Sequence, residues 1–231
     1  MIKLIPLLLA IGWGLAAYMF SAWRTKQMLD AQSVPLKDPE LERLTRRMAA
    51  ALDLPEIRVN LFNIEPVNGL AAPDGRIFLT KGFYDRFRSG SVTAEELASV
   101  IAHELAHVAL GHTRRRMIDF SGQNAVFVSL VALFLRAIPV VGPLIAMFMA
   151  NMITGALAAR MSRRDEFEAD AWASALLIKS GIGTAPQISL FEKLESLTGS
   201  RMAAAPAWAL SHPKSAERIK AIRANEARWT A

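Results

Sequence analysis

The segment His103-Glu104-Leu105-Ala106-His107 constrains this chain of 231 residues more than any other feature. On an α-helix, residues four apart are separated by about 40° around the axis and one turn along it, so both imidazoles can reach one ion. Neutral imidazole nitrogens suit Zn²⁺, and Glu104 lies beside them, where it can take a proton from a water activated by the metal. Because the residues around the motif are apolar, the pattern predicts a buried helix that carries part of a metal site.

The rest of the ligand set must come from elsewhere in the chain. Cysteine is absent, so the metal ligands must be histidine and carboxylate. His112 is five residues after His107, an offset of about 140° that points it away from the ion unless the helix ends at Gly111. Glu166 is a better third ligand, because Asp170 shares its helix face and can orient a ligating histidine. The alternative for this pair is an ordinary acidic helix N-terminus, where carboxylates are favourable anyway.

Periodicity and turn signals predict a mostly α-helical chain with a small β-sheet, an α+β fold. Residues 33–39 read as a linker, after which Asp38 is typical of an N-cap with Pro39 at the first helical position. Thr93 and Glu96 form a capping box that begins the helix carrying the histidine motif. The remaining expected elements are strands at 57–62, 67–72 and 76–80, and helices near 81–88, 162–180, 186–197 and 214–227.

The N-terminal segment predicts a transmembrane anchor over residues 1–30. Residues 4–20 carry no charge, and the apolar character continues to Trp23. As a helix this stretch is about 28 Å long, which is enough to cross a bilayer core. A cleaved signal peptide is the alternative, but Lys3 alone makes a thin basic region and no clear cleavage site precedes the following charges. The hydrophobic share of 52% and the mean hydropathy of +0.25 agree with a chain that lies partly in lipid.

A second apolar block, within residues 124–160, is broken near its middle by prolines and a glycine into two halves that are too short to span a bilayer comfortably. We expect a membrane-associated hairpin inside a catalytic domain of residues 38–231. Arginines lie before the block at 114–116 and after it at 163–164, so the net charge of +6 fits a lipid bilayer better than nucleic acid, for which no motif is present. The excess of basic residues after the anchor favours a bacterial-type inner membrane protein with its catalytic part in the cytoplasm.

Three motifs in order resemble the gluzincin metallopeptidases of the HtpX and CAAX-prenyl-protease type. The first runs over residues 93–112 and includes the paired histidines. The second is Ser162-Arg163-x-x-Glu166-Phe167-x-Ala169-Asp170, and the third is His212-Pro213 followed by Arg218. Together they cover most of residues 55–225. The metal motif alone would not separate this family from other zincins, whereas the three in order are specific.

The resemblance implies a zincin-type catalytic domain and a zinc cofactor, and it gives seven side chains a role. They are the zinc ligands His103, His107 and Glu166, the catalytic base Glu104, the supporting carboxylate Asp170, and His212 and Arg218, which steady the oxyanion. Fixed donors aimed at the negative charge of a tetrahedral intermediate lower the barrier, so the last role is chemically reasonable. The alternative for His212 and Arg218 is a helix N-terminus and an ordinary surface arginine.

The resemblance also implies that a substrate pairs as an added strand beside the active-site helix, at Asn68, Gly69, Leu70 and Ala71. Relatives usually have alanine after the asparagine, and a glycine there loosens a strand. The predicted function is a membrane-anchored zinc endopeptidase that hydrolyses peptide bonds by metal-activated water, in protein quality control or processing. Its expected substrates are proteins or peptides, membrane proteins among them. A non-catalytic zinc-binding membrane adaptor or chaperone-like protein is the alternative, and the sequence does not give the oligomeric state.

Overall fold

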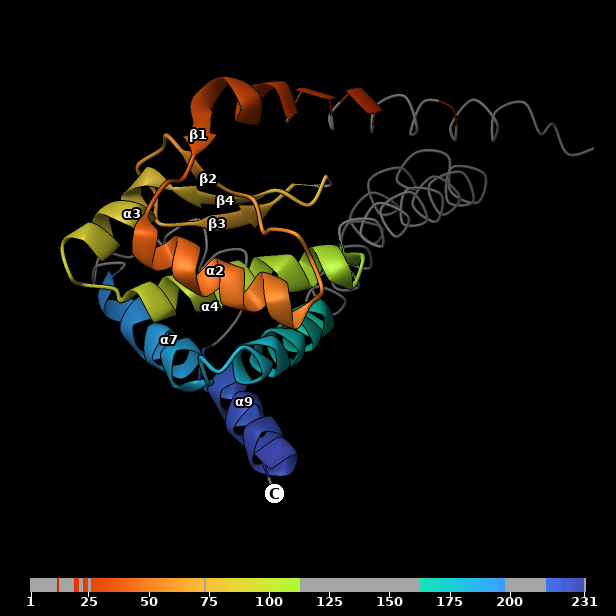
Figure 1. The fold of residues 1–231 in the computed structure, drawn as a ribbon, viewed down its shortest axis with the longest axis vertical. Helices are drawn as coiled ribbons and strands as arrows, with labels where there is room; N and C mark the ends of the chain where they lie inside the picture. Colours follow the sequence, from red (N-terminus) through yellow and green to blue (C-terminus); the bar gives the residue numbers. More distant parts are fainter. Residues whose placement is uncertain are drawn as a thin grey trace, which may run out of the picture. The chain divides into compact units, whose positions relative to one another are not determined.

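The computed structural model describes residues 26–72, 74–112, 163–197 and 215–230, with a few single positions before residue 26. The chain divides into two compact units. One consists of Met1–Met28 and His112–Ser162, and the other of Leu29–Gly111 and Arg163–Ala231. The second unit contains the sheet and the helices labelled in Figure 1, and it is the unit described below.

Four short strands form one mixed sheet: β1 (Ser33–Pro35), β2 (Val59–Phe62), β3 (Gly69–Ala71) and β4 (Ile77–Thr80). Their order is β1-β2-β4-β3, with β2 and β4 parallel and the two outer pairs antiparallel. The three strands predicted at 57–62, 67–72 and 76–80 are found as β2, β3 and β4. β1 lies in the segment read as a linker, where three residues are too few to show an alternating pattern.

The described helices of this unit lie at the positions expected from the sequence, although the last one ends at Thr230 rather than near 227. They are α2 (Pro39–Ala51), α3 (Lys81–Arg88), α4 (Ala94–Ala109), an unlabelled helix at 163–179, α7 (Ala185–Leu197) and α9 (Ser215–Thr230). Asp38 Oδ1 accepts from the Leu41 N–H at 3.2 Å, which confirms the N-cap of α2. The capping box of Thr93 and Glu96 is present at the start of α4. Gly181, at φ +68°, follows the helix 163–179, which lies within the predicted range of 162–180.

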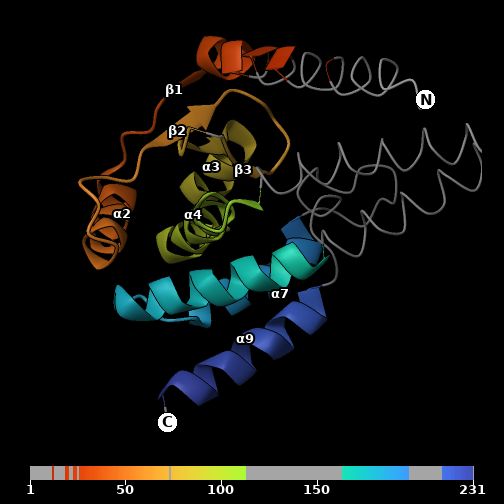
Figure 2. The same cartoon turned by 90° about the vertical axis from the view of Figure 1, so that its right-hand side faces the viewer.

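α4 is the central helix of this unit. Figures 1 and 2 both show it between the sheet on one side and α7 with the helix 163–179 on the other, and it also packs against α2. Its side chains are buried around the whole circumference from Glu96 to His107. A helix buried on all sides cannot rotate or slide without repacking its neighbours, so the fold holds the histidine motif in a fixed place.

The other face of the sheet carries a smaller apolar cluster of Leu29, Phe62, Ala72 and Phe78. Residues 26–32 are helical and supply Leu29 to this cluster. Asp30 lies next to it and pairs with Nη1 of Arg76 at 2.8 Å. Leu29 and Asp30, at the end of the predicted anchor, therefore contact this face of the sheet.

Among the helices described, we find none that is both long and apolar enough to cross a bilayer. The predicted anchor at 1–30 and hairpin at 124–160 lie largely or wholly outside the described residues. Four large apolar side chains near the end of the predicted anchor are described and are exposed to about half or more: Met19, Phe20, Trp23 and Met28.

Candidate metal centre

His103 and His107 face the same side of α4 one turn apart, as their spacing predicts. Their Nε2 atoms are 3.1 Å apart, and the ring centroids are 4.8 Å apart. Both residues are buried, with exposures of 3% and 7%. Two imidazole nitrogens held this close in a dry interior cost free energy unless a cation or a proton lies between them.

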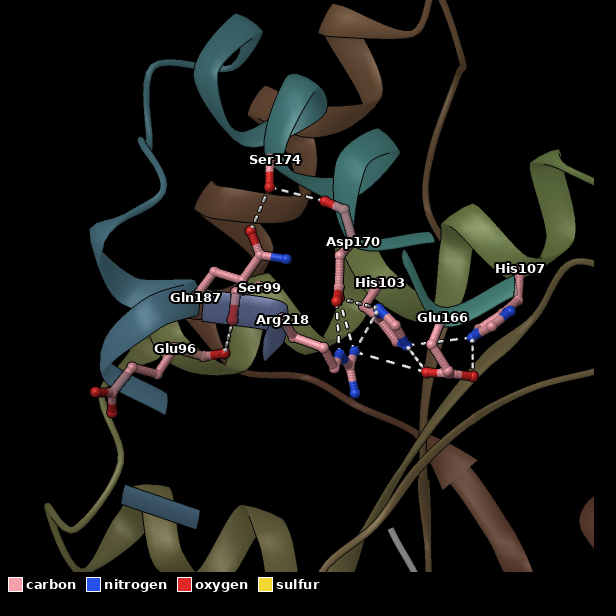
Figure 3. A network of polar contacts seen from close by, with 9 residues as sticks. All are labelled: Glu96, Ser99, His103, His107, Glu166, Asp170, Ser174, Gln187 and Arg218. Atoms are coloured by element: carbon pink, nitrogen blue, oxygen red, sulfur yellow. Dashed lines mark hydrogen bonds and ion pairs between the residues drawn. The ribbon is translucent and has the colours of Figure 1, made fainter. Parts of the chain in front are cut away.

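Glu166 comes to the histidines from the helix 163–179, as Figure 3 shows. Its Oε2 is 3.2 Å from Nε2 of His103, and its Oε1 is 3.4 Å from Nε2 of His107. The residue is completely buried. The sequence allowed two readings of Glu166, a metal ligand or an ordinary acidic residue at a helix N-terminus. In the structure its carboxylate points at both imidazoles.

These three side chains fit a zinc ion. Bonds of about 2.0–2.2 Å in tetrahedral geometry separate neighbouring ligand atoms by roughly 3.3 Å. The distances among the two Nε2 atoms and the carboxylate oxygens are 3.1 to 3.4 Å. Two imidazoles and one carboxylate are also the donor set of catalytic zinc sites, which keep a fourth position open.

Asp170 contacts the first of these histidines. Its Oδ1 is 3.0 Å from Nδ1 of His103. With the proton on Nδ1, the lone pair that can bind a metal is on Nε2. Burial alone would lower the pKa of His103, but the contacts with Asp170 and Glu166 raise it to about 9. The two carboxylates thus favour positive charge at this place, which is what a cation site requires.

Arg218 reaches this carboxylate from α9. Its Nε and Nη2 lie 2.5 and 2.7 Å from the two oxygens of Asp170, a bidentate pair, and its Nη2 is 3.6 Å from Oε2 of Glu166. Only 1% of Arg218 is exposed, so it is not an ordinary surface arginine. Burial alone would raise the pKa of Asp170, but Arg218 and His103 outweigh it and lower that pKa.

Glu104 lies on α4 beside the histidines and is 4% exposed. A methyl group added to Gly69 would be 3.4 Å from its Cγ, so β3 runs directly past this glutamate. β3 is the last strand of the sheet and is paired on one edge with β4. Thr80 N donates to Asn68 O, and Ala72 N donates to Arg76 O, at the two ends of this pairing. His212 lies outside the described residues.

Sequence reasoning did not find the polar residues behind His103. Ser174 Oγ donates to the backbone oxygen of Asp170 at 2.7 Å and lies 2.7 Å from Oε1 of Gln187. Glu96, read only as a capping residue, also accepts from Ser189. The contacts of Ser174 with Gln187 and of Glu96 with Ser189 join helices that are separate in the sequence, so no local pattern marks them.

A helix that supplies two histidines and an adjacent glutamate, completed by a carboxylate from a later helix, is the arrangement of zinc metallopeptidases. A comparison with known families agrees: residues 35–226, most of the chain, match peptidase family M48. The protein belongs to this family of zinc-dependent metallopeptidases.

Individual relatives carry names of the same kind. The chain is 33% identical to the metalloprotease LoiP of Escherichia coli over 167 residues, which cover 72% of this chain and 62% of LoiP. It is 26% identical to protease HtpX of Legionella pneumophila over 96% of this chain and 88% of that protein. A putative beta-barrel assembly-enhancing protease of Vibrio cholerae is 29% identical over 80% of this chain and 38% of its own length.

Proposed function

We propose that this protein is a membrane-anchored zinc endopeptidase in which His103, His107 and Glu166 hold the metal and Glu104 is the general base. The observation that carries the proposal is the convergence of three donor side chains from two helices, at mutual distances of 3.1 to 3.4 Å, with Glu104 beside them. Membership of family M48 gives the same class of chemistry.

When bound, zinc supplies Lewis acidity, which lowers the pKa of a bound water to near 7 and polarises a carbonyl. Glu104 takes the proton of the attacking water and passes it to the leaving amine. Asp170 keeps the His103 ring in the tautomer and orientation that present Nε2. His212 steadies the oxyanion, as the resemblance implies. The bidentate contact of Arg218 with Asp170 favours a positioning role over the oxyanion contact that the resemblance implies.

The free edge of β3 is the proposed binding place for an extended substrate. In an antiparallel pair the hydrogen-bonded positions alternate, and the bonds at Asn68 and Ala72 place Leu70 in the same set. The N–H and C=O groups of Gly69 and Ala71 therefore point away from β4, where a peptide can pair with them.

The opposite edge of the sheet is less suited to peptide pairing. There the bonds of Gln32 and Leu36 with β2 turn the backbone of Pro35 outward, and proline has no N–H to offer. The difference between the edges supports β3 as the place where the scissile bond is brought beside Glu104.

Glu104→Gln tests the assigned base. We expect the variant to bind one zinc ion like the wild type and to cleave casein at least about 10²-fold more slowly. Glu95→Gln, in the first turn of the same helix, is the matched control and should keep both zinc and activity. Full activity in Glu104→Gln would refute the base. Folded wild-type protein without zinc affinity would refute the metal site.

The membrane part of the proposal rests on the uncharged stretch at 4–20 and on the exposed apolar side chains near its end, Trp23 among them. We propose membrane proteins among the substrates and a role in quality control or processing, in line with the name of the Vibrio cholerae relative, a putative beta-barrel assembly-enhancing protease. Because the chain has no cysteine of its own, a label on Arg115→Cys or Arg163→Cys in intact cells marks that position of the chain alone. Labelling from the cytoplasmic side at both positions is expected for a hairpin, and opposite sides would reject it.

A further inference from the structure

α7 is attached to the histidine-bearing helix by an ion pair whose carboxylate is buried and whose lysine is partly exposed. Glu96 of α4, which is 2% exposed, accepts from Ser189 Oγ at 2.6 Å and lies 2.8 Å from Nζ of Lys193. Both partners are on α7, one turn apart. A charged group in the interior is stable only when its partners stay in place, so this contact fixes the position of α7 along α4.

α7 is also attached to the helix that carries Glu166 and Asp170. Gln187 approaches Ser174 at 2.7 Å, and the Ser174 hydroxyl lies equally close to the backbone oxygen of Asp170, as Figure 3 shows. Gln187 and Ser174 are both buried. α7 therefore has a defined place against both helices that supply the metal ligands.

The third contact of α7 is with Arg218 of α9. Cζ of Arg218 lies 4.4 Å from the ring centroid of Phe191, so the guanidinium stacks over the ring face while its edge binds Asp170. Phe191 and Arg218 are both buried, at 5% and 1% exposure. A cation removed from water gains most from an aromatic face, and the flat ring limits the guanidinium to orientations parallel to it.

We propose that Phe191 is a positioning residue for the metal centre. Its ring holds the guanidinium of Arg218 in the orientation that binds both oxygens of Asp170, and Asp170 in turn holds the His103 ring. α7 is the rigid support for this contact because it is fixed to the two ligand-bearing helices. The inference rests on the proposed zinc site and adds a residue outside the three proposed ligands and the proposed base.

Phe191→Leu tests it, because leucine keeps an apolar side chain and removes the aromatic face. Leu190→Val is the matched control: Leu190 is the buried neighbour on α7 and lines the same small cavity beside His103. We expect Phe191→Leu to weaken zinc binding, measured by competition with a chelating dye, on the order of 10-fold. kcat should fall while KM stays unchanged. Leu190→Val should stay within about twofold in each quantity, and equal effects of the two variants would overturn the proposal.

A second comparison separates positioning from general packing. In an Arg218→Lys background the planar group is gone, so Phe191→Leu should change zinc affinity by less than about twofold, and an undiminished effect would overturn the proposal. Phe191→Tyr keeps the ring face and should bind zinc within about threefold of the wild type, which gives a folded variant if leucine is not tolerated. Wild-type protein that fails to bind zinc would instead refute the metal site itself.

Discussion

Gly69 on β3 approaches Val100 on α4 so closely that a methyl group at residue 69 would lie 2.7 Å from Cγ1 of Val100. The sequence alone suggests that a glycine here loosens the strand. The structure gives it another role, since any side chain would push β3 away from the helix that carries Glu104. The distance between the free strand edge and the candidate base thus depends on the absence of a Cβ atom at one position.

Gly69→Ala should therefore lower the free energy of unfolding by about 1–3 kcal/mol, as overpacking of a buried contact does. Val100→Ala removes Cγ1 and leaves a cavity, so alone it should cost about 2 kcal/mol. In the double variant the new methyl occupies that space, and the loss should be smaller than the sum of the single losses by at least about 1 kcal/mol. Urea unfolding of the four proteins measures this, and simple additivity would show that the two residues do not compete for space.

Ala71→Pro tests the substrate edge directly. Proline removes the N–H that points away from β4 and leaves the hydrogen bonds between β3 and β4 in place. We expect KM for a peptide substrate to rise several-fold with zinc affinity unchanged. Ala71→Val at the same position keeps the N–H and favours a strand, so it should retain the wild-type KM. A proline variant with normal KM would show that peptides bind elsewhere.

Asp170→Asn should weaken both the fold and the metal site. The substitution keeps the shape of the side chain but removes the carboxylate that pairs with the buried Arg218 through two hydrogen bonds, which costs about 3–5 kcal/mol of unfolding free energy. Loss of the carboxylate behind His103 should also lower zinc affinity about 10- to 100-fold.

The matched control for this prediction is an exposed pair of the same kind. Glu192 pairs with Arg223 at 3.3 Å, and both side chains are more than half exposed. Glu192→Gln should therefore change the unfolding free energy by less than about 1 kcal/mol. Denaturant unfolding and chelator competition on both variants give the comparison. Equal stability losses would mean that the Asp170 pair is not the buried support that its contacts indicate.

Features that depend on neighbours in sequence were predictable. The Asp38 cap, the capping box of Thr93 with Glu96 and the one-turn spacing of His103 and His107 all follow from local geometry, and each is found as expected. The burial of α4 also follows, because the residues around its histidine motif are apolar.

Features that depend on contacts between distant helices were not predictable. Lys193 and Glu96 are 97 positions apart, and no periodicity in either helix indicates that they meet. Phe191 likewise reads as one more apolar residue of an amphipathic helix until α9 is placed against it. β1 was missed for a related reason, since its three residues become a strand only by pairing with β2.

Glu96 predicts how stability depends on pH. Burial alone would raise the pKa of its carboxyl, but hydrogen bonds from Lys193, Ser189 and the backbone of Thr93 outweigh burial and lower the pKa below its ordinary value of 4.5. A carboxyl whose pKa is lower in the folded state than in the unfolded state stabilises the fold at pH values above the unfolded pKa. That stabilisation is lost as the pH falls through the lower, folded pKa.

Glu96→Gln should therefore reduce stability at pH 7 and flatten the fall in unfolding free energy below about pH 4.5. Glu95→Gln is the control on the same helix turn, where the carboxylate is partly exposed and lies 3.8 Å from an exposed arginine. Its profile should follow that of the wild type, because a solvated pair at that distance adds little. Urea unfolding from pH 3 to 7, with a chelator present in every sample so that zinc release does not enter, measures the three curves. If Glu96→Gln keeps the wild-type slope at acid pH, the contact between α4 and α7 does not carry the charge that we assign to it.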